Sequence, residues 1–137
     1  MQKKFTRSYD SLEEIFEFTE RFFETETINE SVRFPVHFVM EELFTNMVKY
    51  NPGNSNDILL GLDKIDSNVT ISLTDYDVDP FDVTEERDVD IESPLTERKV
   101  GGLGLHLIKK MVDSIEYDYT DRQSKITFTK GIKQTDV

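Results

Sequence analysis

The spacing of apolar residues changes near residue 57 from a helical period to a strand period, and this change limits the folds open to the chain. Over residues 11–24 and again over 31–50, apolar side chains recur every three or four positions, which predicts two amphipathic helices in succession. Beyond residue 57 the first apolar pattern has a period of two, which is typical of strands. Tandem helices followed by paired strands indicate an α+β protein.

Two sequence signals indicate where the helices begin. Ser11 followed by Glu14 has the pattern of a capping box, in which each residue satisfies a free backbone N–H of the other. Ser31 is expected to cap the second helix and to leave Pro35 in its first turn. A proline is tolerated there because the first turn has no N–H partner to lose.

Five segments have the composition and alternation of strands: residues 3–8, 58–65, 68–77, 114–120 and 125–130. In the third of these, apolar residues alternate with threonine and serine, so this strand should bury one face. Asp66, Ser67 and Asn68 are expected to form the turn between the second and third segments.

A long acidic segment and a third helix separate the two strand pairs. Residues 75–97 hold ten acidic residues and one basic residue, which predicts a solvated loop of a length that is often functional. Glycines 101, 102 and 104 then open a new helical pattern. The expected architecture is a two-layer α+β sandwich, with a mostly antiparallel mixed sheet and helices on one face. We expect one domain over residues 1–130 and a C-terminal tail over 131–137.

Composition excludes several classes of function. The chain has 137 residues and a net charge of −12, which disfavours nucleic acids and anionic membranes as partners because both need a cationic surface. The absence of cysteine excludes disulfides, zinc thiolates and a thiol nucleophile. No stretch approaches the ~20 apolar residues of a membrane span, and we expect a cytoplasmic protein.

Glu42 and Asn46 are the first candidates for chemistry. Four residues apart on the second helix, they share one face beside its apolar stripe. An asparagine oxygen can ligate Mg²⁺, which usually takes few protein ligands together with phosphates and water. A carboxylate one turn away can orient or deprotonate a nucleophile. The alternative is that both are boundary residues of an amphipathic helix.

Asp75 is the next candidate, because it lies where a half-buried strand ends and the acidic loop begins. A carboxylate at such a position can accept hydrogen bonds from an exocyclic amine in a cavity. The alternative is an ordinary polar strand end, since aspartate is common where strands become turns.

Gly102 and Gly104 open the third helix, with Arg98 and Lys99 shortly before it. Backbone N–H groups at a helix N-terminus bind phosphate well, and glycine allows close approach. The two cations could add positive charge. A glycine hinge without a ligand is the alternative.

Taken in order, these motifs resemble a known family. EELFTN on the second helix, TDYDVDPFD after a hairpin, GGLGLHLIKKMVD at the third helix and two closing strands resemble the histidine-kinase-like (GHKL) ATPase family, which has a Bergerat-type ATP-binding fold. Within it, PFD and GGLGLHLIKKMVDSIEY are similar to the single-domain anti-sigma factor serine/threonine kinases. The resemblance covers about residues 5–130.

This resemblance implies ATP and Mg²⁺ as cofactors, and a role for each candidate. Asn46 would ligate Mg²⁺ between the ATP phosphates, and Glu42 would be the catalytic carboxylate. Asp75 would accept a hydrogen bond from the adenine amino group, and Ser124 would place a hydroxyl near the adenine. Gly102 and Gly104 would let the helix N-terminus meet the phosphates.

The implied function is an ATP-dependent serine/threonine kinase. It would phosphorylate an anti-sigma antagonist protein and would also bind a sigma factor, and a homodimer is open. The sequence departs from the family at Asp77, where relatives usually have glycine after Asp-x. An aspartate adds bulk and negative charge where the base approaches. The alternative function is therefore a regulatory module that binds nucleotide weakly or not at all and acts by sequestering a partner.

Overall fold

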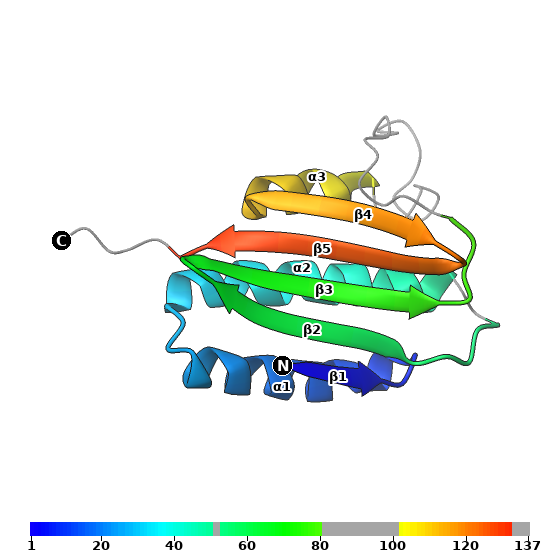
Figure 1. Cartoon of the computed structure of the whole chain (residues 1–137), viewed down its shortest axis with the longest axis horizontal. Helices are drawn as coiled ribbons and strands as arrows, with labels where there is room; N and C mark the ends of the chain where they lie inside the picture. The colour runs from blue at the N-terminus through cyan, green and yellow to red at the C-terminus, as the bar shows by residue number, and fades with distance from the viewer. Residues whose placement is uncertain (51–52, 81–101, 133–137) are drawn as a thin grey trace.

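The computed structural model describes residues 1–50, 53–80 and 102–132, and for residues 102–106 only the backbone (Figure 1). Its sheet contains strands β1 to β5 and its other layer contains helices α1 to α3. The strands are β1 (Gln2–Phe5), β2 (Ile58–Ile65), β3 (Asn68–Tyr76), β4 (Ser114–Thr120) and β5 (Gln123–Gly131). The helices are α1 (Leu12–Thr25), α2 (Glu30–Tyr50) and α3 (Gly102–Met111), and a short 3₁₀ turn, η1 (Tyr9–Ser11), precedes α1.

The five strands form one sheet in the order β1-β2-β3-β5-β4, and each pairing in it is antiparallel. Ile65 pairs with Asn68, so the β2–β3 turn consists of Asp66 and Ser67 alone. Thr120 pairs with Gln123, and the β4–β5 turn is Asp121–Arg122. The expected α+β sheet with its two hairpins is confirmed.

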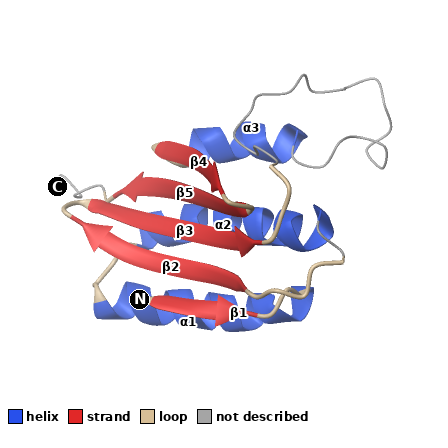
Figure 2. Ribbon diagram, turned by 45° about the vertical axis from the view of Figure 1, so that its right-hand side comes forward, coloured by secondary structure: helices blue, strands red, loops and turns tan. Residues whose placement is uncertain are grey.

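The helices lie together on one face of this sheet. Both views show α1 behind β1 at the edge of the sheet, and α2 behind the centre of the sheet (Figures 1 and 2). The inward rows of β2, β3 and β5 are almost fully buried, and they meet the apolar faces of α1 and α2 to form the core. Burial of apolar surface between these layers is the main force that stabilises the fold. The inward rows are Ile58, Leu60 and Leu62 on β2; Val69, Ile71 and Leu73 on β3; and Ile126 and Phe128 on β5.

The first strand is shorter than the sequence indicated, because the chain leaves the sheet after Phe5. The N–H of Ser8 bonds the carbonyl of Thr6 at 2.8 Å, and the Ser8 hydroxyl accepts the N–H of Asp10 at 3.2 Å. This turn starts η1 and takes Arg7 out of the strand pattern. The Arg7 side chain can therefore lie along the end of the sheet.

Both predicted helix caps are corrected. Ser11 already has helical backbone angles, and its hydroxyl donates to the carbonyl of Thr6 at 2.7 Å instead of capping α1. The η1 turn runs directly into α1, so no capping box with Glu14 forms. In α2 the capping side chain is Asn29, whose Oδ1 accepts the N–H of Ser31 at 3.1 Å. The helix thus begins at Glu30, and Pro35 lies in its second turn rather than its first.

Aromatic and polar contacts join α1 to α2. His37 Nε2 lies 2.7 Å from Oε1 of Glu20, and Arg33 reaches the other oxygen of that carboxylate at 3.3 Å. Phe16 stacks on the His37 ring with centroids 3.9 Å apart, whereas Phe23 belongs to the buried core. The phenylalanines of α1 therefore serve mainly in packing, although Phe16 is half exposed.

At the other end of the chain, β5 continues through Gly131, which pairs with Asn68. The N–H of Ile132 bonds the carbonyl of Ser67 at 2.7 Å. Pairing thus extends past the expected strand end at residue 130, and residues 133–137 lie outside the described part of the chain.

Candidate functional site

A cavity of about 200 Å³ lies where the end of α2 meets the ends of β3 and β5. Three predicted site residues line it, namely Asn46 from α2, Asp75 from β3 and Ser124 from β5. Its other lining residues are Leu43, Met47, Tyr50, Val78, Asp79, Pro80 and Ile126. Whole ligand sites usually measure about 300–1,000 Å³, so the described residues enclose room for part of a ligand, such as a heteroaromatic base.

The alternation of β3 and β5 explains why Asp75 and Ser124 face this cavity. Asp75 continues the inward row that contains Leu73, and Ser124 continues the inward row that contains Ile126. The two polar residues are direct partners in the β3–β5 ladder, with 2% and 7% of their surfaces exposed. Each therefore ends an apolar row with a buried polar group at the edge of the core.

Helix α2 provides the other polar side of the site. Asn46 and Glu42 are both half-buried, and they lie one turn apart on α2. Asn46 lines the cavity, whereas Glu42 is not among its lining residues. The structure thus brings Asn46, Asp75 and Ser124 together and places Glu42 one helical turn away from them.

The predicted phosphate-binding residues lie at the border of the described chain. Arg98 and Lys99 fall outside the described residues. Helix α3 begins at Gly102, and Gly104 lies in its first turn, as the glycine pattern predicted. Their part in binding phosphate stays a prediction.

Asp77 does not direct its negative charge into the cavity, contrary to what the sequence suggested. Its backbone is left-handed, with φ of 58°, a conformation that glycine adopts without strain and that aspartate tolerates better than most residues. Its carboxylate accepts a hydrogen bond from Nε of Arg122 at 2.8 Å, and Asp77 is not among the residues that line the cavity. The aspartate therefore keeps the backbone form of a glycine and pairs its charge with a cation instead of presenting it to the cavity.

Arg122 holds two carboxylates at once. Its NH1 donates to Asp79 at 3.0 Å, and the hydrogen bonds that Arg122 donates to Asp77, the larger effect, and to Asp79 raise the pKa of Arg122 above its usual range. The carbonyl of Arg122 also accepts the N–H of Val78 at 3.0 Å. The β4–β5 turn thereby holds the segment that leaves β3.

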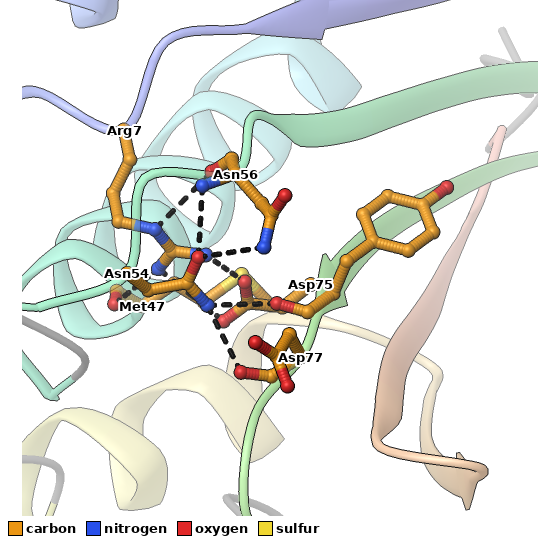
Figure 3. A network of polar contacts seen from close by, with 7 residues as sticks. Arg7, Met47, Asn54, Asn56, Asp75 and Asp77 are labelled. Atoms are coloured by element: carbon orange, nitrogen blue, oxygen red, sulfur yellow. Dashed lines mark hydrogen bonds and ion pairs between the residues drawn. The ribbon is translucent and has the colours of Figure 1, made fainter.

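The structure adds two residues that carried no signal in the sequence, Arg7 and Asn54 (Figure 3). Arg7 forms an ion pair with Asp75. The Asn54 amide donates to the carbonyls of Tyr76 and Asp77, at 2.7 and 3.2 Å. Both residues lie far from Asp75 in sequence, so only the folded topology brings them to the end of β3.

The donor set fits Mg²⁺ only as a partner of phosphate groups. The described residues contain no cluster of three or more His, Cys, Asp or Glu side chains able to hold a metal ion. A single amide oxygen from Asn46 matches the way Mg²⁺ is bound with few protein ligands, several waters and substrate phosphates.

Fold and cavity together define an α+β domain with a partly polar cavity at the ends of its central strands. The family model for the histidine kinase-like ATPase domain matches residues 5–130, and the chain belongs to this family. Membership implies ATP as the ligand. The chain is also similar to a solved structure, the histidine kinase AdeS of Acinetobacter baumannii. The TM-score is 0.55 at 13% sequence identity, over 98% of this chain and 68% of that one, and this likeness concerns the fold.

No curated protein matches the sequence. Among the described residues, no helix has the length and apolar character needed to cross a membrane.

Proposed function

We propose that the protein is an ATP-binding anti-sigma regulatory factor with serine/threonine kinase activity toward an anti-sigma antagonist protein. The observation that carries the proposal is the meeting of Asn46, Asp75 and Ser124 at one cavity, in a chain of the histidine kinase-like ATPase family. The finer assignment rests on the resemblance of the PFD and GGLGLHLIKKMVDSIEY segments to the anti-sigma kinases. The proposed partners are a sigma factor, the antagonist and, in a homodimer, a second copy of the chain.

Each polar residue of the site has a proposed task. Asp75 and Ser124 bind the adenine from the strand ends, and Asn46 ligates Mg²⁺ at the phosphates. Bound ATP would supply the phosphoryl group, and Mg²⁺ would offset the negative charge of the phosphates. Glu42 accepts the proton of the attacking hydroxyl, while Arg98, Lys99 and the N–H groups at Gly102 and Gly104 hold the phosphates. Such a site acts by positioning and electrostatics rather than by covalent chemistry on the protein.

The alternative function is a partner-sequestering module with weak or no nucleotide binding. The reason for this alternative is the negative charge of Asp77 near the base. The pairing of Asp77 with Arg122, outside the cavity lining, weakens that ground and favours the nucleotide-binding function.

Calorimetric titration with ATP and ADP, with and without Mg²⁺, tests the binding part. The wild-type protein should bind with an affinity that Mg²⁺ strengthens for ATP. Asn46→Ala should lose the Mg²⁺ effect, and Asp75→Asn should weaken both nucleotides. No heat at high nucleotide concentration, together with no thermal shift, would overturn the nucleotide-binding function and leave the sequestering alternative.

Phosphoryl transfer is tested with labelled ATP and the small proteins that co-purify from the protein's own cells. Label on serine or threonine of such a partner is expected with the wild-type chain. Glu42→Gln should bind ATP as before and transfer no label. A variant that still transfers at the wild-type rate would remove Glu42 from the mechanism.

A further inference from the structure

Arg7 bonds Asp75 (Figure 3), which lines the cavity together with Asn46 and Ser124; this cavity is called the base site below. Its guanidinium bonds both oxygens of the Asp75 carboxylate, through NH2 to Oδ1 and through NH1 to Oδ2. The same group donates to the carbonyl of Met47 at 2.9 Å and to the carbonyl of Asn56 at 3.3 Å. Every N–H-bearing nitrogen of the guanidinium therefore has an acceptor, from the last turn of α2, the segment before β2 and the end of β3.

This ion pair is buried. Only 5% of the Arg7 side chain and 3% of the Asp75 side chain are exposed. Asp75 and Met47 line the cavity, whereas Arg7 does not. Arg7 thus contacts the base site only through other groups, and Asp75 lies between it and the cavity.

The charge of Arg7 determines what Asp75 can offer a ligand. A guanidinium stays protonated in proteins, and it binds a carboxylate in a planar two-point contact. An ionised carboxylate is only an acceptor, whereas a protonated one also donates. A buried carboxylate without its counter-charge is costly. Arg7 accordingly compensates the charge of the buried carboxylate and fixes its orientation.

We propose that Arg7 is a positioning residue that makes the site selective for purines with a 6-amino group over purines with a 6-oxo group. The inference rests on the proposed nucleotide-binding function and names what enforces its base preference. An adenine amino group can donate to the held carboxylate, because carboxylate oxygens accept hydrogen bonds. A 6-oxo base places an oxygen against that carboxylate, which leaves two acceptors facing each other without a proton.

The experiment compares binding of ATP and inosine triphosphate (ITP), whose bases differ at position 6, to the full chain by calorimetric titration in Mg²⁺. The wild-type protein should prefer ATP. Arg7→Met should lower the ATP-to-ITP ratio of affinities by about 10- to 100-fold, the value of a hydrogen bond to a charged group. Arg7→Lys keeps the charge but loses the two-point contact, so its ratio should fall less.

Arg33→Met is the matched control. Arg33 also pairs with a carboxylate, that of Glu20 at 3.3 Å, but it lies between α1 and α2 and does not line the cavity. The ATP-to-ITP ratio of affinities in Arg33→Met should equal that of the wild-type protein. Circular dichroism establishes that each variant is folded, and if Arg7→Met does not fold, the ratio in Arg7→Lys decides.

The outcomes separate the inference from the function on which it rests. An unchanged ATP-to-ITP ratio of affinities in Arg7→Met or, if that variant does not fold, in Arg7→Lys overturns the inference. If both affinities fall equally, the ratio is unchanged and the ion pair is purely structural. Equal binding of ATP and ITP by the wild-type protein also overturns the inference, while the proposed ATP site stands. A wild-type protein that binds neither nucleotide overturns both.

Discussion

Asp77 and Arg122 lie on adjacent strand connections, and their side chains meet with Oδ1 of the aspartate 2.8 Å from Nε of the arginine. Both have left-handed backbone, with φ of 58° and 62°. Two conformations that suit glycine thus occur at two charged residues that bind each other. The contact holds the charge of an aspartate in a left-handed conformation away from the cavity lining.

Replacing Asp77 with glycine should therefore change little at the base site. Glycine adopts the left-handed conformation freely, and the exposed ion pair that is lost contributes little to stability. ATP affinity in Asp77→Gly should stay within about threefold of the wild-type value, well below the tenfold that corresponds to ~1.4 kcal/mol. Calorimetric titration measures it, and a rise of more than tenfold would show that the carboxylate opposes the ligand.

Asp77→Val is the control for the backbone. A β-branched residue at this φ is strained, at a cost of about 1–3 kcal/mol. Urea denaturation should show this loss of stability for valine and a much smaller change for glycine. Equal stability of the two variants would contradict the left-handed conformation at residue 77.

Ser124→Ala tests the hydroxyl opposite Asp75. If the hydroxyl bonds the base or orients Asp75, its removal should weaken ATP binding by about 0.5–1.5 kcal/mol, the net value of one hydrogen bond. Thr127→Ala on the same strand is the matched control, because Thr127 does not line the cavity. The hypothesis fails if both variants bind ATP as the wild-type protein does.

Asn54→Ala should loosen the segment that follows β3. Its amide donates to two carbonyls there, and its Oδ1 accepts the N–H of Asn56 at 2.8 Å. Losing these contacts should cost about 1–3 kcal/mol of the free energy of unfolding, measured by urea denaturation. Asn56→Ala keeps the backbone carbonyl that accepts from Arg7, so it should cost less. A larger loss of unfolding free energy in Asn56→Ala than in Asn54→Ala would contradict this expectation.

Phe44→Ala should cost about 3–5 kcal/mol, because a fully buried ring leaves a cavity in the core. Phe34 on the same helix is 67% exposed, and Phe34→Ala should stay within about 0.5 kcal/mol of the wild-type value. Chemical denaturation of both variants gives the comparison. Similar losses would mean that the outer face of α2 is covered in solution.

The order and type of the elements could be predicted because they depend on local periodicity. The alternation of Val69, Ile71 and Leu73 continues to Asp75, and this phase alone already turns that carboxylate inward. The caps were wrong at Ser11 and Ser31, because a preceding turn and a competing asparagine took their places. Residue type shows which side chains are able to cap a helix, whereas the path of the chain determines which of them does.

The contacts of Arg7 could not be predicted, because no local pattern relates it to Asp75. The residues are 68 positions apart, and they meet because β1 and β3 flank β2 and the chain turns out of the sheet after Phe5. Asn46, Asp75 and Ser124 are each predicted singly or by family resemblance. The β3–β5 pairing brings Asp75 to Ser124, and the packing of α2 against these strands adds Asn46 to the cavity. The position of Asp77 outside that cavity likewise depends on the β4–β5 turn, which brings Arg122 to it.

The base site draws on widely separated parts of the chain, which bears on when it forms during synthesis. Arg7 follows β1, whereas the lining residues Asn46, Asp75 and Ile126 come from α2, β3 and β5. The cavity therefore cannot be complete until residue 126 has left the ribosome. Contacts between residues far apart in sequence form late, because closing the long loop between them first costs conformational entropy. The α1–α2 pair and the β2–β3 hairpin can assemble earlier. Nucleotide is therefore expected to act on the finished domain as a late stabiliser, and not as a template for the nascent chain.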